Sequence, residues 1–133
     1  MKTITISGID YNISCNALSH IKYKSLFNRR MISDIDIIKD YLVKQTIATL
    51  KLQEEKYNQE ELQKLLSKFM MEYVDEFLEA LTRITYIMIL TSNENIGSYE
   101  KWLESIPRLS TDDQWIFEVT EYAVDCFCWW RSF

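Results

Sequence analysis

The sequence predicts a mainly α-helical domain (α+β) of about four to five helices with a small N-terminal β-hairpin. Three observations indicate this class. Apolar residues recur at spacings of three and four along most of the chain after residue 16. Only the first 15 residues alternate apolar and polar side chains with a period of two. Glycine and proline, the usual breakers of helices, occur only two times and once in 133 residues.

Residues 1–15 are predicted to form the hairpin. Ile4 and Ile6 alternate with Thr and Ser before Gly8, and a Tyr and an Ile alternate with Asn and Ser after it. Alternation on both sides of a turn that contains glycine is typical of a β-hairpin. Because an isolated hairpin is only marginally stable, its apolar face is expected to lie on another part of the chain.

Residues 16–52 are predicted to form two helices. Asn16 is a plausible N-cap for the first helix, which extends to about Asn28. Ser33, with Asp36 three residues later, resembles a capping box and is expected to open the second helix.

Residues 53–61, "QEEKYNQEE", are predicted to be a charged connector, with a solvated helical stretch as the alternative, because they have no apolar face. Asn58 with Glu61 offers a further helix start. Residues 62–92 are predicted to form a long helix, which is amphipathic up to about Leu81 and apolar nearly all round after it. That second half is therefore expected to be central in the fold. The stripe that predicts the helix consists of Leu62, Leu65, Leu66, Phe69, Tyr73, Phe77, Leu81, Ile84 and Met88.

Two more helices are predicted near the C-terminus. A polar stretch, "TSNENIGS", separates the long helix from a short helix at residues 98–106, which Pro107 ends. Ser110 with Asp113 is expected to start the last helix, at residues 111–130.

Composition places the chain, residues 1–133, as a single domain. Twenty acidic residues against 15 basic ones give a net charge of −5, which opposes general attraction to nucleic acid. The N-terminus lacks the apolar region of a signal peptide, and the longest apolar stretch, 84–90, is far shorter than the roughly 20 residues of a membrane span. A soluble intracellular protein is expected, with its three cysteines reduced.

A metal site formed by Cys15, His20, Cys126 and Cys128 is conceivable if the two ends of the chain meet. On a helix, however, positions i and i+2 point about 200° apart, so Cys126 and Cys128 do not readily share one ion. The alternative is that the cysteines are small apolar residues that fill gaps in the core. Cys15 with His20 lacks any recognisable oxyanion site or nucleophile elbow. No catalytic residue, metal or cofactor is predicted.

Two charged clusters have alternative interpretations. Asp34, Asp36 and Asp40 lack the spacing of a calcium loop, and acidic residues in the first turn of a helix are expected from the helix dipole alone. The one basic cluster is either a solvated helix face or the contact surface of a small helical DNA-associated or regulatory protein. Its residues are Lys22, Lys24, Arg29 and Arg30.

Two stretches of the chain resemble a known family. One is "ITISGIDYNIS" followed by "NALSHIKYKSLFNRRMISDI", and the other is "LTRITYIMILTSNENIGSYEKWLESI". The first resembles the opening of tail assembly chaperones of long-tailed phages and prophages, with a hairpin, an aromatic and basic helix, and a D-[IL] helix start. The second is similar to their apolar helix, polar loop and Y-E-x-W-L turn. The resemblance covers residues 1–40 and 80–106, whereas residues 41–79 fit by length and helicity.

The resemblance implies a non-enzymatic protein that acts in the cytoplasm of the bacterial host. Chaperones of this family bind the tape measure protein, a long, largely helical and apolar chain, keep it soluble, and help recruit tail tube subunits. In many such systems a ribosomal frameshift adds a C-terminal domain. An amphipathic helix is usually bound in an apolar groove, and weak self-association along the tape measure would raise avidity.

The residues preferred for partner contact come from the short helix and the C-terminal tail. The aromatic residues of the last helix and tail are too many for one buried face, and exposed Trp and Phe usually mark a binding surface. Trp102 has an alternative interpretation as a core anchor beside Pro107. The predicted patch consists of Tyr99, Trp102, Leu103, Trp129, Trp130 and Phe133.

Overall fold

The computed structural model describes residues 1–53, 58–110 and 113–127, and these residues form a mainly α-helical fold with an N-terminal β-hairpin, as predicted. The strands β1 and β2 form a two-stranded antiparallel sheet. The elements of the described ranges follow in the order β1 (Lys2–Ile6), β2 (Ile9–Ile13), α1 (Ala17–Phe27), α2 (Met31–Leu52), α3 (Gln59–Ser92), α4 (Tyr99–Glu104) and α5 (Gln114–Phe127).

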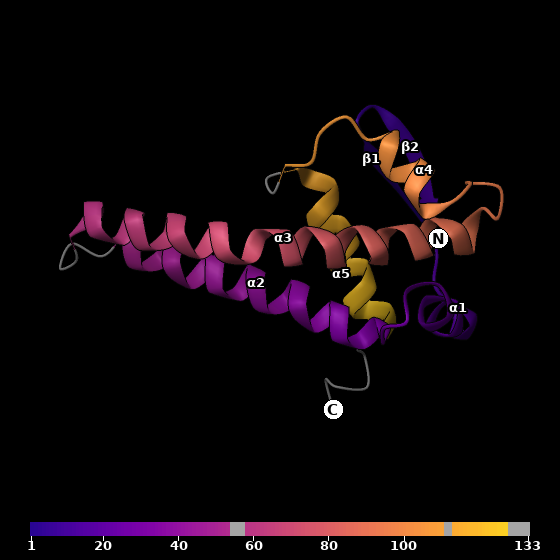
Figure 1. The fold of residues 1–133 in the computed structure, drawn as a ribbon, viewed down its shortest axis with the longest axis horizontal. Coiled ribbons are helices and arrows are strands. Elements are labelled where there is room, and N and C mark those ends of the chain that lie inside the picture. The colour runs from indigo at the N-terminus through magenta and orange to yellow at the C-terminus, as the bar shows by residue number, and fades with distance from the viewer. Residues whose placement is uncertain (54–57, 111–112, 128–133) are drawn as a thin grey trace.

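The 34-residue helix α3 is the element around which the others are arranged (Figure 1). Helix α2 lies along it, and the two helices project together as an arm away from the other elements. The hairpin and α4 lie on one side of the C-terminal half of α3, α1 lies on the other side, and α5 crosses it (Figure 1). The C-terminal half of α3 is therefore covered from several directions, whereas its N-terminal half is accompanied by α2.

The hairpin turn has the backbone geometry that its sequence indicates. Ser7 and Gly8 have φ angles of 51° and 80°, and positive values at both turn positions match the twist of the flanking strands. Ile4 pairs with Tyr11 across the ladder, and Ile6 pairs with Ile9. The inner face of the hairpin is buried on α3 and α5, which supplies the support that an isolated hairpin lacks.

Asparagine side chains begin two helices where the sequence offers caps, and residues 59–61 of the predicted connector belong to the first turn of α3. The Asn16 side chain accepts a hydrogen bond from the Leu18 N–H at 2.9 Å, and Ser19 completes a capping box with it. The Asn58 side chain accepts from the N–H groups of Glu60 and Glu61 at 3.0 and 3.4 Å. Each cap satisfies backbone donors that would otherwise lack a partner in the first turn.

Helix α2 begins earlier than its sequence suggested, and the predicted capping box at Ser33 is wrong. The helix starts at Met31, and Arg30 precedes it without a side-chain cap. Met31 is buried in line with Ile35. Burying a methionine stabilises the fold by roughly 2 kcal/mol, against about 1 kcal/mol for a serine cap. Burial of the first turn therefore decides where α2 begins.

Helix α5 begins later than predicted. It starts at Gln114 and runs to Phe127, whereas the sequence suggested residues 111–130. Asp113 directly precedes the helix, and its carbonyl oxygen accepts a hydrogen bond from the Ile116 N–H at 3.2 Å. Residues 128–130 of the predicted helix lie outside the described part of the chain.

The second half of α3 is central, as its apolar character predicted. Between Phe77 and Ile89 the helix buries residues on every side, because the hairpin, α1, α2, α4 and α5 all contact α3. The core residues outside α3 come from every other element of the described chain. They are Ile4, Ile6, Ile13, Tyr23, Met31, Ile35, Ile38, Tyr41, Trp102, Trp115, Ile116, Val119 and Ala123.

Candidate partner-binding groove on the α2–α3 arm

The arm exposes apolar side chains because only two helices form its outer half. A helix packed against a single neighbour buries one stripe and leaves the rest of its surface in water. Here the stripes that face water carry large apolar residues in addition to the charged ones expected there. The exposed apolar side chains of the arm are Val43, Ile47 and Leu50 on α2, and Leu65, Met71 and Tyr73 on α3.

A groove between α2 and α3 collects part of this apolar surface. Its outer section has a volume of about 280 Å³, and a smaller section of about 120 Å³ adjoins it toward the body of the protein. The two sections share Lys44 and Phe69, so they form one continuous groove. The outer section is lined by Lys44, Ile47, Ala48, Lys51, Leu65, Leu66 and Phe69, and the inner section by Ile37, Asp40, Tyr41, Lys44, Phe69, Tyr73 and Glu76.

Aromatic stacking holds the inner wall of the groove. The Tyr41 ring stacks on Phe77 with centroids 4.2 Å apart and on Phe69 with centroids 5.9 Å apart. The Tyr41 hydroxyl donates a hydrogen bond to the Met70 sulfur at 2.9 Å. Stacked rings of this kind stabilise a packing beyond the area that they bury. The groove therefore has a wall that is formed before any partner arrives.

Charged side chains border the groove unequally. The Lys44 ammonium lies 3.0 Å from the Asp40 carboxylate and 5.6 Å from the centre of the Tyr73 ring. The hydrogen bond that the Lys44 ammonium donates to the Asp40 carboxylate, with the charge of that carboxylate, raises the pKa of Lys44. Lys51 lies at the outer end of the groove, and Asp40 and Glu76 lie at the end near the body. The groove is thus basic at its outer end and acidic at its inner end.

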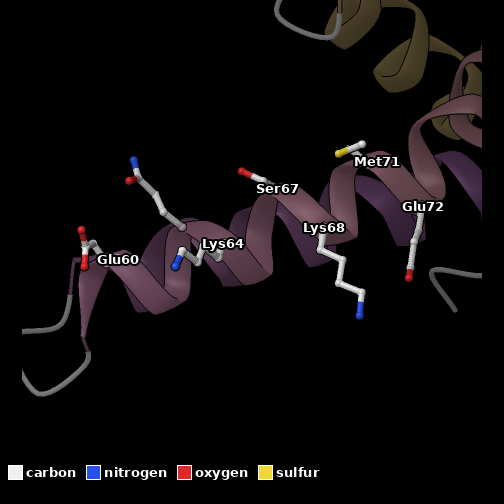
Figure 2. Close-up of a pocket in the computed structure, with 7 residues that line it drawn as sticks. Glu60, Lys64, Ser67, Lys68, Met71 and Glu72 are labelled. Atoms are coloured by element: carbon white, nitrogen blue, oxygen red, sulfur yellow. The ribbon is translucent and has the colours of Figure 1, made fainter.

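A second hollow, on α3, has a different character (Figure 2). Every residue that lines it belongs to α3, and none of them lines the groove. Lys64, Lys68 and Glu72 follow one another at helical spacing, and Ser67 and Met71 lie beside them (Figure 2). A surface formed by one helix offers no second wall, so this hollow is a solvated helix face with one exposed methionine.

Asp34 is the centre of a buried ion-pair network that the sequence did not indicate. Its carboxylate has no exposed surface and accepts hydrogen bonds from Arg29 at 2.7 and 2.9 Å, from Arg83 at 2.9 and 3.3 Å, and from the Tyr23 hydroxyl. Burial alone would raise the pKa of the Asp34 carboxyl, but the two guanidinium groups and the phenol together hold that pKa below its ordinary value. The network joins α1, α2 and α3.

The predicted reduced state of the cysteines differs from the structure. Cys15, between β2 and α1, and Cys126, in the last turn of α5, form a disulfide with their Cα atoms 6.5 Å apart. This pair is unavailable as a set of metal ligands, and Cys128 lies outside the described residues. Across residues 1–53, 58–110 and 113–127, no cluster of three metal-ligating side chains occurs.

The predicted partner patch divides into a buried part and an undescribed part. Trp102 is only 3% exposed and packs against Tyr11 and Tyr86, so its ring is a core anchor and is not available as a surface contact. Tyr99 is half-buried, and its hydroxyl lies 2.8 Å from that of Thr82. The other partly buried member of α4 is Leu103, and Trp129, Trp130 and Phe133 lie outside the described residues.

None of the described residues predicted for partner contact lines the groove. Tyr99 and Trp102 are brought together, but they hold α4 against the core. The exposed stripe of Val43, Ile47 and Leu50 follows α2 at spacings of four and three, and of these three residues Ile47 lines the groove. An apolar stripe in addition to the buried one indicates a surface for a partner.

Comparisons of the chain with protein-family models, with curated proteins and with solved structures found no match. Along the described parts of the chain, no helix has both the length and the apolar character that crossing a membrane requires.

Proposed function

We propose that this chain is a non-enzymatic tail assembly chaperone of a long-tailed phage or prophage. It binds the tape measure protein in the cytoplasm of the bacterial host and assists assembly of the tail tube. The observation that carries the proposal is the apolar groove on the α2–α3 arm, together with the resemblance of residues 1–40 and 80–106 to that family.

The groove has the properties that a helical apolar partner requires. A helix that enters a groove between two helices buries its apolar stripe against side chains from both walls. Ile47 on α2 and Leu65 on α3 supply one apolar residue to each wall and are 47% and 63% exposed. When a partner covers an exposed apolar surface of this kind, apolar area is removed from water, and this favours binding.

One of the four basic residues that the DNA-associated alternative requires is engaged by an interaction within the fold. Arg29 donates two hydrogen bonds to the buried Asp34 carboxylate, so its charge already has a partner inside the protein. The net charge of −5 also opposes binding to phosphate backbones. A shift of duplex DNA that weakens steeply with salt would favour this alternative over the chaperone.

Co-expression with the tape measure protein of the same phage tests the proposal. We expect the soluble fraction of the tape measure protein to rise several-fold when the wild-type chain is present. The double variant Ile47→Asp, Leu65→Asp should lose most of this effect, because each charge would have to be desolvated when a partner helix covers the groove. The measurement is quantification of the tape measure protein in soluble and pelleted fractions.

Met71→Asp is the matched control. Met71 is 78% exposed on α3, and it lies in the hollow of Figure 2 and not in the groove. The Met71→Asp variant should solubilise the tape measure protein as well as the wild type does. A tape measure protein that stays equally insoluble with and without the wild-type chain would exclude the proposed function.

A further inference from the structure

The groove on the α2–α3 arm has an apolar lining, and the charges on its rim differ in sign between its two ends. Lys51 borders its outer end, Lys44 borders its middle, and Asp40, which pairs with Lys44, borders its inner end together with Glu76. From Ile37 to Lys51 the groove follows α2 for a length of roughly 21 Å, about four turns of helix. A partner helix of that length would therefore meet a positive rim at one end and a negative rim at the other.

On the basis of the proposed function, we propose that the groove binds amphipathic helical segments that carry one particular charge pattern. It binds these segments in one orientation. The apolar stripe of the segment packs between Ile47 and Leu65. Acidic residues of the segment lie over Lys51 at the outer end, and basic residues lie beside Asp40 and Glu76 at the inner end. Charge complementarity at a rim sets orientation and selects partners more than it raises affinity.

A second copy of this chain fits the groove less well. In a two-fold symmetric pair, a residue at the centre of the contact meets its own counterpart. Lys44 lies at the centre of the groove and belongs to both of its sections. A symmetric pairing would consequently place two lysines opposite each other, and like charges in that position oppose association.

Three labelled synthetic peptides of about four helical turns test this inference, with fluorescence anisotropy as the measurement. All three carry the same leucine stripe. One has glutamates at its first end and lysines at its last, the second has these charges exchanged end for end, and the third has lysines at both ends. The exchanged peptide has the same composition as the first, and it can still bind by reversing its direction.

Direction is read from a quencher at the first end of each peptide and a fluorophore on a cysteine introduced near the outer end of the groove, in a chain that lacks Cys128. The first peptide should quench this fluorophore and the exchanged peptide should not. The all-lysine peptide should bind roughly fivefold more weakly than the first, because it keeps the contact with the acidic inner end but places lysines against Lys51 at the outer end. This difference should shrink at high salt.

Two variants link these results to the groove. Lys51→Glu should reduce or reverse the preference for the first peptide over the all-lysine one, while Ile47→Asp should weaken all three peptides. Met71→Asp should change nothing, and circular dichroism should show unaltered helix content in each variant. Ile47 is already half exposed, so the charged side chain is accommodated in the free protein.

Equal binding of all three peptides, or equal quenching by the first and the exchanged peptide, would overturn the inference and leave the chaperone function standing. Normal peptide selectivity without any effect on the tape measure protein in co-expression would instead exclude the proposed function alone. A wild-type dimer that Ile47→Asp converts to a monomer, with no peptide bound, would show that a second copy occupies the groove and would also overturn the inference.

Discussion

Replacing Asp34 with asparagine is expected to destabilise the protein by about 3 kcal/mol, because it leaves two guanidinium groups without their shared counter-charge. The Asp34 carboxylate has no exposed surface, and the Arg83 side chain is 15% exposed. Water therefore cannot replace the lost interaction fully. Urea unfolding followed by circular dichroism would measure the change in the free energy of unfolding.

The same network predicts how stability depends on pH. The pKa of Asp34 in the folded protein lies below its ordinary value of 3.8. The ionised carboxylate therefore stabilises the fold at every pH above about 4, and this contribution is lost as the pH falls from there through the folded pKa. Asp34→Asn should lack this part of the acid dependence, so its stability should fall less between pH 5 and acid conditions than that of the wild type.

Asp40→Asn is the control for both measurements. Asp40 and Lys44 form an exposed pair one helical turn apart, and water and salt screen such pairs so that they contribute little to stability. Its unfolding midpoint should stay close to that of the wild type. An Asp34→Asn protein as stable as the Asp40→Asn protein would contradict the buried ion-pair network.

Breaking the Cys15–Cys126 disulfide is expected to produce the second large effect. The bond closes a sequence separation of 111 residues. A cross-link of that span lowers the conformational entropy of the unfolded chain and so raises the free energy of unfolding by about 4 kcal/mol. For a protein of 133 residues this corresponds to a decrease of roughly 10–15 °C in Tm. Thermal unfolding with and without a dithiol reductant would show the shift.

Single cysteine variants identify the bond responsible. Cys126→Ser and Cys15→Ser should lower Tm to the value of the reduced wild type and should no longer respond to reductant. Cys128→Ser should behave as the wild type does in both conditions, since Cys128 is outside the pair. Alkylation of all three cysteines of the air-oxidised wild type without reductant would show that the bond does not form in solution.

The disulfide also provides a test of where the protein acts. Bacterial cytoplasm keeps thiols reduced. A chaperone that works there is expected to hold Cys15 and Cys126 as thiols in the cell and to close the bond on oxidation after lysis. Trapping thiols in intact cells before lysis, followed by mass spectrometry, would report the state of the pair.

Local sequence was enough to predict several elements. Asn16 and Asn58 could be placed as caps because a cap depends on a side chain and the N–H groups two and three residues later. The hairpin could be predicted because Gly8 and the alternation around it are also local. The central position of the second half of α3 followed from its apolar character on all sides.

Features that depend on distant partners were missed or misplaced. The local sequence predicts for Asp34 only the role of an acidic residue near a helix start, although it follows Met31 by three residues and precedes Ile38 by four, both of which are buried. This helical spacing places Asp34 on the core-facing stripe. The contact between α2 and α3 brings Arg83 to Asp34, where the guanidinium balances the carboxylate charge.

The sequence by itself determined which segments become helices and strands, because hydrophobic period and capping act over a few residues. Only the tertiary structure decided that Trp102 is buried, that Cys15 meets Cys126, and that α2 and α3 leave a groove between them. The physical reason is that the burial of a side chain depends on what packs against it. For Cys15 that neighbour is Cys126, which lies 111 residues away in the sequence. The hydrophobic periodicity of the chain does not encode this contact.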